Sequence, residues 1–331
     1  MTTRMARRID GAMLCLGVLV IAAMGVAWWA PWKPTLVVWS CGSNYESIAD
    51  FSRGFEEGHN CRVRYTGAPV QYLLELALQR TGEVDVIVGR AGPGWEKLRQ
   101  EDKLAYGPVY FVVDPYVIIT QQGNPKGIAG LEDLGKPGIR VAHSPYAMRP
   151  RGMCPAHLMA AASEQFHPGL VERWENNAVD VLKCGRMLHE PVVAGEADAA
   201  VVPLNVTAWP ELRGRVEVIP IDTKYLLAMK QCRATMPQCA GVVARARQSE
   251  LARAFVDELA APSGRALLER HGYVHISAPQ AKAFEPLLEV FVPQNMAAWQ
   301  VHLGRRLDAD EVHREAIRRF FCVINLFGPS Q

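Results

Sequence analysis

Short apolar runs alternate between residues 35 and 276 with longer stretches in which apolar positions recur every three or four residues. The run at residues 36–39 is typical of a buried strand, and residues 46–57 place Ile48, Phe51 and Phe55 on one helical face. The same contrast predicts strands at residues 61–65, 84–88, 116–120, 139–143, 199–203, 216–221 and 241–244. It predicts helices at residues 70–79, 154–163, 186–193, 249–260 and 263–270. This alternation predicts an α/β fold with βαβ crossovers and mostly parallel sheets covered on both faces.

The length of 331 residues is about twice that of a usual single domain and predicts two lobes. We assign residues 33–113 and 224–276 to the first lobe and residues 114–223 to the second. Residues 277–331 carry a longer amphipathic pattern, which we interpret as a C-terminal helical extension. With 49% hydrophobic and 21% charged residues, the composition excludes disordered and collagen-like chains.

Residues 1–32 have the pattern of an export signal. Arg4, Arg7 and Arg8 precede residues 11–30, which contain no charged side chain. About 20 apolar residues suffice to span a bilayer, and the cluster of Trp28, Trp29 and Trp32 at the end of the run suits a membrane interface. These features favour an uncleaved anchor over a removed signal peptide. The remaining chain is then expected on the periplasmic or extracellular face, tethered to the inner membrane.

Charge and motif content exclude other classes of protein. The chain has 36 Lys and Arg against 34 Asp and Glu, and this balance argues against a protein that grips nucleic acid phosphates. It contains no G-x-S-x-G elbow, phosphate loop or zincin helix. An enzyme is therefore not indicated, and no resident cofactor is predicted.

Four turns that follow predicted strands or precede predicted helices are rich in glycine and small residues: residues 40–44, 66–69, 144–152 and 183–185. Ligands of open α/β sheets bind beyond the carboxyl ends of the strands. Backbone N–H groups at helix starts, together with the helix dipole, favour anions there. The pattern indicates an oxyanion site between the lobes, while plain helix capping is the alternative explanation for the same residues.

Several short motifs follow one another along the chain: LVVWSCGS at residues 36–43, FEE at 55–57, VDVIV at 84–88, GNP at 123–125, LEDL at 131–134, IRVA at 139–142 and AGEADA at 194–199. In their order and spacing they resemble the periplasmic molybdate-binding proteins, within the two-lobed solute-binding proteins of ABC importers. The resemblance covers residues 35–276. It implies a monomeric Venus-flytrap protein that closes on a small ligand by a hinge motion and delivers it to an ABC permease.

The resemblance implies ligand contacts at particular positions of the first lobe. The first serine of the family's site corresponds to Ser43, which follows the first strand. The second serine falls on Ala68, which has no hydroxyl. A tyrosine from the second lobe falls on Pro203, which offers neither a hydroxyl nor an N–H.

In the second lobe, the resemblance implies backbone donors at Ala147 and Gly185, where only an N–H is needed. Met148 lies beside Ala147 and is included as a ligand contact. Arg149 follows and supplies a positive charge to an anion, unless it is an ordinary exposed base.

A second hypothesis comes from the cysteines. Cys41, Cys154 and Cys184 occur in or beside three of the four turns, with methionines and histidines near them in the sequence. Thiolates, thioethers and imidazoles are the ligands that copper(I) and zinc prefer, so a soft-metal site on the same fold is the alternative function. A disulfide between Cys154 and Cys184 would remove two of these ligands.

Cys232 and Cys239 form a separate pair. They enclose six residues that include a proline, in what the family resemblance indicates is an insertion. In an exported chain, two such cysteines predict a disulfide that closes a short loop.

Overall fold

The computed structural model of the chain describes residues 33–68, 70–80, 82–143, 159, 162–180, 185–222, 225 and 237–275. The predicted signal or anchor at residues 1–32 and the predicted C-terminal extension at residues 277–331 lie outside these residues. Most of the predicted helix at residues 154–163 also lies outside them. Among the described residues, no helix has the length and apolar character needed to cross a membrane.

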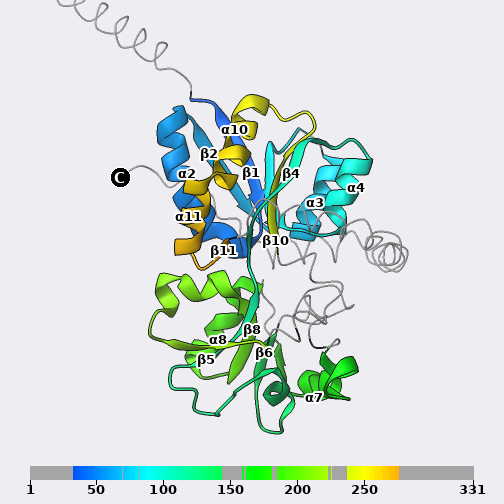
Figure 1. Cartoon of the computed structure of the whole chain (residues 1–331), viewed down its shortest axis with the longest axis vertical. Helices are drawn as coiled ribbons and strands as arrows, with labels where there is room; N and C mark the ends of the chain where they lie inside the picture. Colours follow the sequence, from blue (N-terminus) through cyan, green and yellow to red (C-terminus); the bar gives the residue numbers. More distant parts are fainter. Residues whose placement is uncertain are drawn as a thin grey trace, which may run out of the picture. The chain divides into compact units, whose positions relative to one another are not determined.

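Sheet A has six strands in the order β11-β4-β10-β3-β1-β2 (Figure 1). Its strands are β1 (Thr35–Ser40), β2 (Arg62–Gly67), β3 (Val86–Arg90), β4 (Leu104–Val113), β10 (Pro237–Val243) and β11 (Val274–His275). β1 pairs in parallel with β2 and β3. β10 lies between β3 and β4 and is antiparallel to both, and β11 is antiparallel to β4.

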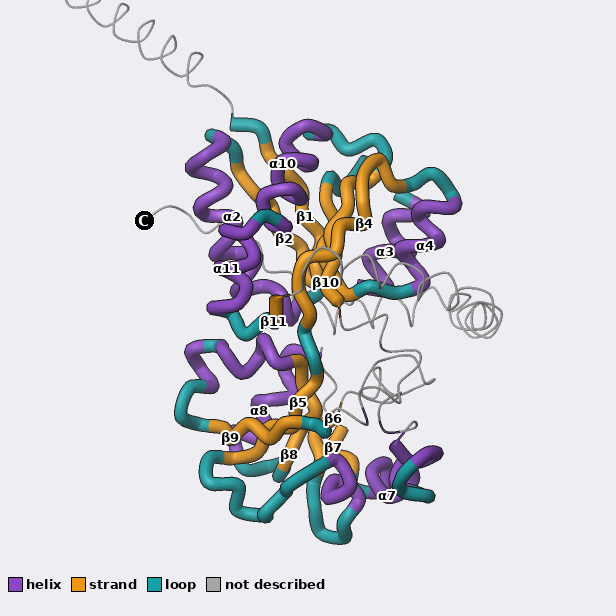
Figure 2. Tube along the Cα trace, viewed as in Figure 1, coloured by secondary structure: helices purple, strands orange, loops and turns teal. Residues whose placement is uncertain are grey.

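Helices cover both faces of sheet A (Figure 2). One face carries α2 (Tyr45–His59), α10 (Ser249–Ala260) and α11 (Pro262–Arg270), and the other carries α3 (Val70–Gln79) and α4 (Pro93–Gln100). Side chains alternate along β1. Leu36 and Val38 pack in the core on the face of α2, α10 and α11, whereas Val37 and Trp39 pack in the core on the face of α3 and α4. This two-sided burial explains the uninterrupted apolar run at the start of the described chain.

Sheet B has five strands in the order β7-β6-β8-β5-β9. Its strands are β5 (Tyr116–Gln121), β6 (Val141–His143), β7 (Ala178–Asp180), β8 (Ala199–Pro203) and β9 (Val216–Pro220). The core on one face includes residues of α7 (Leu170–Asn176) and the 3-10 helix η2 (Leu131–Gly135). The core on the other face includes residues of η3 (Gly185–Leu188) and α8 (His189–Ala194).

The predicted α/β class with two lobes is confirmed, but the prediction of mostly parallel sheets is wrong. Both sheets are mixed, because β10 enters sheet A antiparallel to its neighbours and β5 runs antiparallel to β8 and β9. The chain leaves sheet A after β4 and returns to it only at β10, so no local βαβ crossover sets the direction of β10. The strand that we predicted at residues 241–244 begins earlier and is longer in the structure, where β10 spans Pro237–Val243.

Candidate functional site

The turn after β1 holds Ser43, the first predicted ligand residue. It forms a short 3-10 helix, η1 (Gly42–Asn44), in which the Asn44 N–H donates to the Cys41 carbonyl at 2.9 Å. The side chain of Ser43 is 5% exposed, and its hydroxyl donates to the Cys41 sulfur at 3.2 Å. The Tyr65 hydroxyl donates to the Cys41 carbonyl at 2.6 Å and fixes the turn from β2.

η1 of the first lobe contacts two elements of the second lobe. They are η3, which begins at Gly185, and η4 (Leu204–Ala208), which follows β8. The structure therefore brings the turns of Ser43 and Gly185 together from opposite lobes. Ala147, Met148 and Arg149 lie outside the described residues, so their predicted ligand contacts stay predictions.

Ala68, the position of the family's second serine, lies directly after the last paired residue of β2. Its backbone N–H donates to the Ser40 carbonyl at 2.9 Å, and its side chain is buried. This bond extends the pairing of β1 with β2 by one residue, so the Ala68 N–H is already satisfied. Ala68 therefore has neither a hydroxyl nor a spare N–H to offer an anion.

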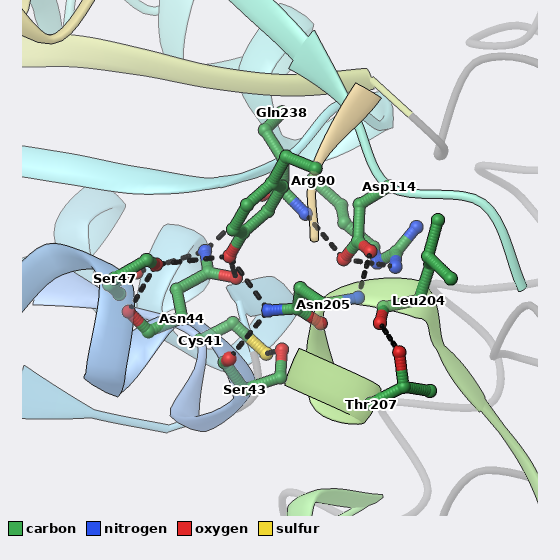
Figure 3. Close-up of polar contacts among 12 residues, drawn as sticks. Cys41, Ser43, Asn44, Ser47, Arg90, Asp114, Leu204, Asn205, Thr207 and Gln238 are labelled. Atoms are coloured by element: carbon green, nitrogen blue, oxygen red, sulfur yellow. Dashed lines mark hydrogen bonds and ion pairs between the residues drawn. The ribbon is translucent and has the colours of Figure 1, made fainter. Parts of the chain in front are cut away.

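Asn205, in η4, joins the two lobes and was missed by sequence reasoning. Its Nδ2 donates to the Ser43 carbonyl at 2.7 Å (Figure 3). The same Nδ2 donates to the Tyr273 hydroxyl, also at 2.7 Å. Its backbone N–H donates to Asp114 Oδ1 at 3.1 Å. The only available signal was an amide residue shortly after a buried strand, at the carboxyl end of β8, which is where ligands of such sheets are expected.

Arg90 and Asp114 form a buried ion pair where the chain passes from β4 to β5. Arg90 Nη2 lies 2.8 Å from Asp114 Oδ2, and the side chains are 7% and 0% exposed. Gln238 Nε2 donates to the same oxygen at 3.3 Å, and the Arg90 guanidinium lies 4.6 Å from the centroid of the Tyr116 ring. Burial raises the pKa of Asp114, while Arg90 and the Asn205 and Gln238 donors oppose the shift. Arg90 thus favours the charged form of the carboxylate that tethers η4.

The predicted Cys232–Cys239 disulfide is not formed, because Cys239 is a free thiol. Cys239 lies within β10 rather than in a surface loop, and its fully buried side chain packs in the apolar core with Trp95 and Tyr110. Burial raises the pKa of this thiol well above its ordinary value. Cys232 lies outside the described residues.

Thiol labelling of the full chain checks this correction. We expect a water-soluble maleimide to label the partly exposed Cys41 in the native protein and to leave Cys239 unmodified, since Cys239 is buried and protonated. After unfolding without reductant, Cys239 is expected to react fully. If the unfolded chain is labelled at Cys239 only after a reductant is added, Cys239 is in a disulfide and our correction is wrong.

The soft-metal hypothesis is not tested by the structure. Cys41 is described, whereas Cys154 and Cys184 are not. In the part of the chain that is described, no group of three or more His, Cys, Asp or Glu side chains is placed to hold a metal ion.

Two α/β lobes whose strand-end turns contact each other define a two-lobed binding protein. The chain belongs to the family of bacterial extracellular solute-binding proteins, which it matches over residues 36–274. It is therefore an extracytoplasmic binding protein rather than an enzyme.

Individual relatives support this assignment. The molybdate-binding protein ModA of Mycobacterium tuberculosis is 25% identical over 280 residues, covering 79% of this chain and 94% of ModA. The periplasmic molybdate-binding protein of Azotobacter vinelandii has a similar fold, with a TM-score of 0.57 at 15% identity, covering 73% of this chain and 100% of that chain. The sulfate-binding protein SubI of M. tuberculosis gives a TM-score of 0.56 at 21% identity, covering 77% of this chain and 91% of SubI.

Proposed function

We propose that the chain is the solute-binding component of an ABC-type importer and that its ligand is a small oxyanion such as molybdate. The similarity to ModA supports this class of ligand. The observation that carries the proposal is Ser43, a hydroxyl at the carboxyl end of β1, in the turn where η1 contacts η3 of the other lobe. A ligand held there touches both lobes and can draw them together.

The chemistry of the Ser43 turn suits an oxyanion. A thiol sulfur is a weak acceptor, so the Ser43 hydroxyl can leave Cys41 for an anionic oxygen at little cost. The first N–H groups of a helix have no partner within the helix, and both η1 and η3 begin in this region. Hydrogen bonds from neutral donors to an anion are shorter and stronger than bonds between neutral groups. Ala147, Met148, Arg149 and Gly185 are the proposed contacts from the second lobe.

Replacing Ser43 with alanine tests the proposal. We expect the affinity of the full chain for molybdate to fall about tenfold to a hundredfold, since a hydrogen bond to a charged group contributes about 1.5–3 kcal/mol. Isothermal titration calorimetry measures the change. Ser52→Ala is the matched control, because the Ser52 hydroxyl is buried in α2 and has no partner among the described residues. Equal molybdate affinity of the wild type and Ser43→Ala would mean that the Ser43 hydroxyl does not bind the ligand.

We also propose that residues 1–32 tether the protein to the inner membrane. The three arginines and the uncharged run at residues 11–30 support this proposal. A tether would keep the binding protein close to its permease.

A further inference from the structure

The amide of Asn205 is the hydrogen-bonding link between η4 of the second lobe and the ligand turn of the first. We infer that Asn205 is a positioning residue: through the Ser43 carbonyl it holds the Ser43 turn in its conformation and couples that turn to the crossing between the lobes. The inference deepens the proposed function and rests on it for the identity of the ligand. The coupling itself is a property of the protein alone.

Asn205 is hydrogen-bonded to η1 directly at Ser43 and, through Tyr273, indirectly at Asn44. Its Nδ2 donates directly to the Ser43 carbonyl at 2.7 Å. The same Nδ2 donates to the Tyr273 hydroxyl at 2.7 Å, and that hydroxyl donates to Asn44 Oδ1 at 2.9 Å. Asn44 in turn donates to Gln238 Oε1 at 3.3 Å. The turn that presents the Ser43 hydroxyl is therefore held from the opposite lobe by the Asn205 amide, in addition to its partners in the first lobe.

The backbone of η4 is attached to the crossing between the sheets. The Asn205 N–H donates to Asp114 Oδ1 at 3.1 Å, and the Leu204 N–H donates to the Pro115 carbonyl at 2.8 Å. Asp114 and Pro115 are the residues between β4 and β5. Because hinge motions concentrate at such element ends, a change at the crossing moves Asn205 and, through it, Ser43.

The surroundings of Asn205 indicate more than structural support. The residue is 1% exposed, and its Oδ1 has no hydrogen-bond partner among the described residues. A buried carbonyl without a donor lowers stability. The side chain thus contributes two donors to the first lobe and leaves its own acceptor unsatisfied, a poor arrangement for stability alone.

Hydrogen exchange in full-length Asn205→Ala tests the coupling. The amides of Asn44 and Tyr45 close η1 by donating to Cys41 and Gly42, so they report on the turn. We expect their exchange to become at least about tenfold faster in Asn205→Ala, as expected when a local opening becomes easier. Thr207→Ala is the matched control: its hydroxyl donates to Leu204 within η4 and does not reach the first lobe, so exchange in η1 should stay unchanged.

Molybdate titration of a double-mutant cycle tests the consequence for binding. In the chain that keeps Ser43, Asn205→Ala should weaken molybdate binding about tenfold. In the Ser43→Ala variant, adding Asn205→Ala should lower the molybdate affinity by less than about twofold, because Asn205 acts through Ser43. Additive losses would overturn the inference.

The outcomes separate the inference from the proposed function. Unchanged exchange at η1, or faster exchange spread evenly over both lobes, overturns the positioning role whatever the ligand is. If the wild type binds no oxyanion, the proposed function fails, and the exchange result still decides whether Asn205 holds the turn. Should Asn205→Ala fail to fold, Asn205→Ser, whose hydroxyl is too short to reach both partners, replaces it with the same expected results.

Discussion

Replacing Arg90 with methionine is expected to lower the free energy of unfolding by about 3–5 kcal/mol, the usual cost of leaving one member of a buried ion pair alone. Asp114 is fully buried, and Arg90 is its only ion-pair partner among the described residues. Gln238 and the Asn205 N–H remain as donors but carry no positive charge. Denaturant unfolding of the full chain measures the loss.

The same variant has a defined pH dependence. Without Arg90 the pKa of Asp114 rises further, because the guanidinium is the largest influence that opposes the effect of burial. A carboxyl whose folded pKa exceeds its unfolded pKa lowers stability when it is ionised, and this penalty decreases as the pH falls below the folded pKa and is gone below the unfolded pKa. The stability difference between Arg90→Met and the wild type should therefore be smaller at pH 5 than at pH 8.

Two controls isolate the effect of burial at Arg90. Arg80→Met breaks the pair with Glu83, in which the two side chains are 59% and 54% exposed, and should cost far less because water already screens both charges. Adding Asp114→Asn to Arg90→Met should recover part of the loss, since it removes the unpaired carboxylate. A small, pH-independent effect of Arg90→Met would contradict our description of the pair.

Replacing Trp95 with alanine is expected to destabilise the first lobe by about 3–5 kcal/mol, the usual range for truncating a buried aromatic side chain. Trp95 is fully buried in α4, and its indole N–H donates to the Arg90 carbonyl at 3.0 Å. A Cβ at Gly241 would lie 3.0 Å from the Trp95 ring, so the ring packs directly on the backbone of β10. The truncation would leave a cavity beside the strand end that carries Arg90.

Trp95→Phe separates the two contributions of Trp95. It keeps most of the packing against β10 and loses the hydrogen bond to Arg90, so a smaller loss than in Trp95→Ala is expected. Thermal unfolding of both variants beside the wild type provides the comparison. An alanine variant as stable as the phenylalanine variant would mean that packing against β10 contributes little.

Elements with a long periodic pattern were predictable from the sequence. The bounds predicted for the helix at residues 249–260 agree with α10, and residues 70–79 agree with α3. The eight-residue α4 was missed because Pro93, Gly94 and its charged residues weaken the apolar pattern. β7 was missed because it contains only two apolar residues, Ala178 and Val179, before it ends at the charged Asp180. The antiparallel direction of β10 could not be predicted from the sequence, because its neighbours β3 and β4 lie more than a hundred residues earlier.

Residues of the candidate site divide in the same way. The turn of Ser43 was predictable because it follows a buried strand directly, and Gly185 because it begins a helical segment. Asn205 and Asp114 could not be singled out, since their importance comes from partners in the other lobe and at the crossing. The hydrogen bond from the Ala68 N–H to the Ser40 carbonyl was not predictable from sequence spacing, because it depends on the pairing of β2 with β1.

The most direct test of the account is native mass spectrometry of the full-length chain with molybdate, tungstate, sulfate, phosphate, copper(I) and zinc, each offered alone. We predict one oxyanion per chain in the wild type and a much weaker adduct in Ser43→Ala. A copper or zinc adduct accompanied by loss of reactive thiols, with no oxyanion bound, would contradict the account and assign the fold to metal handling.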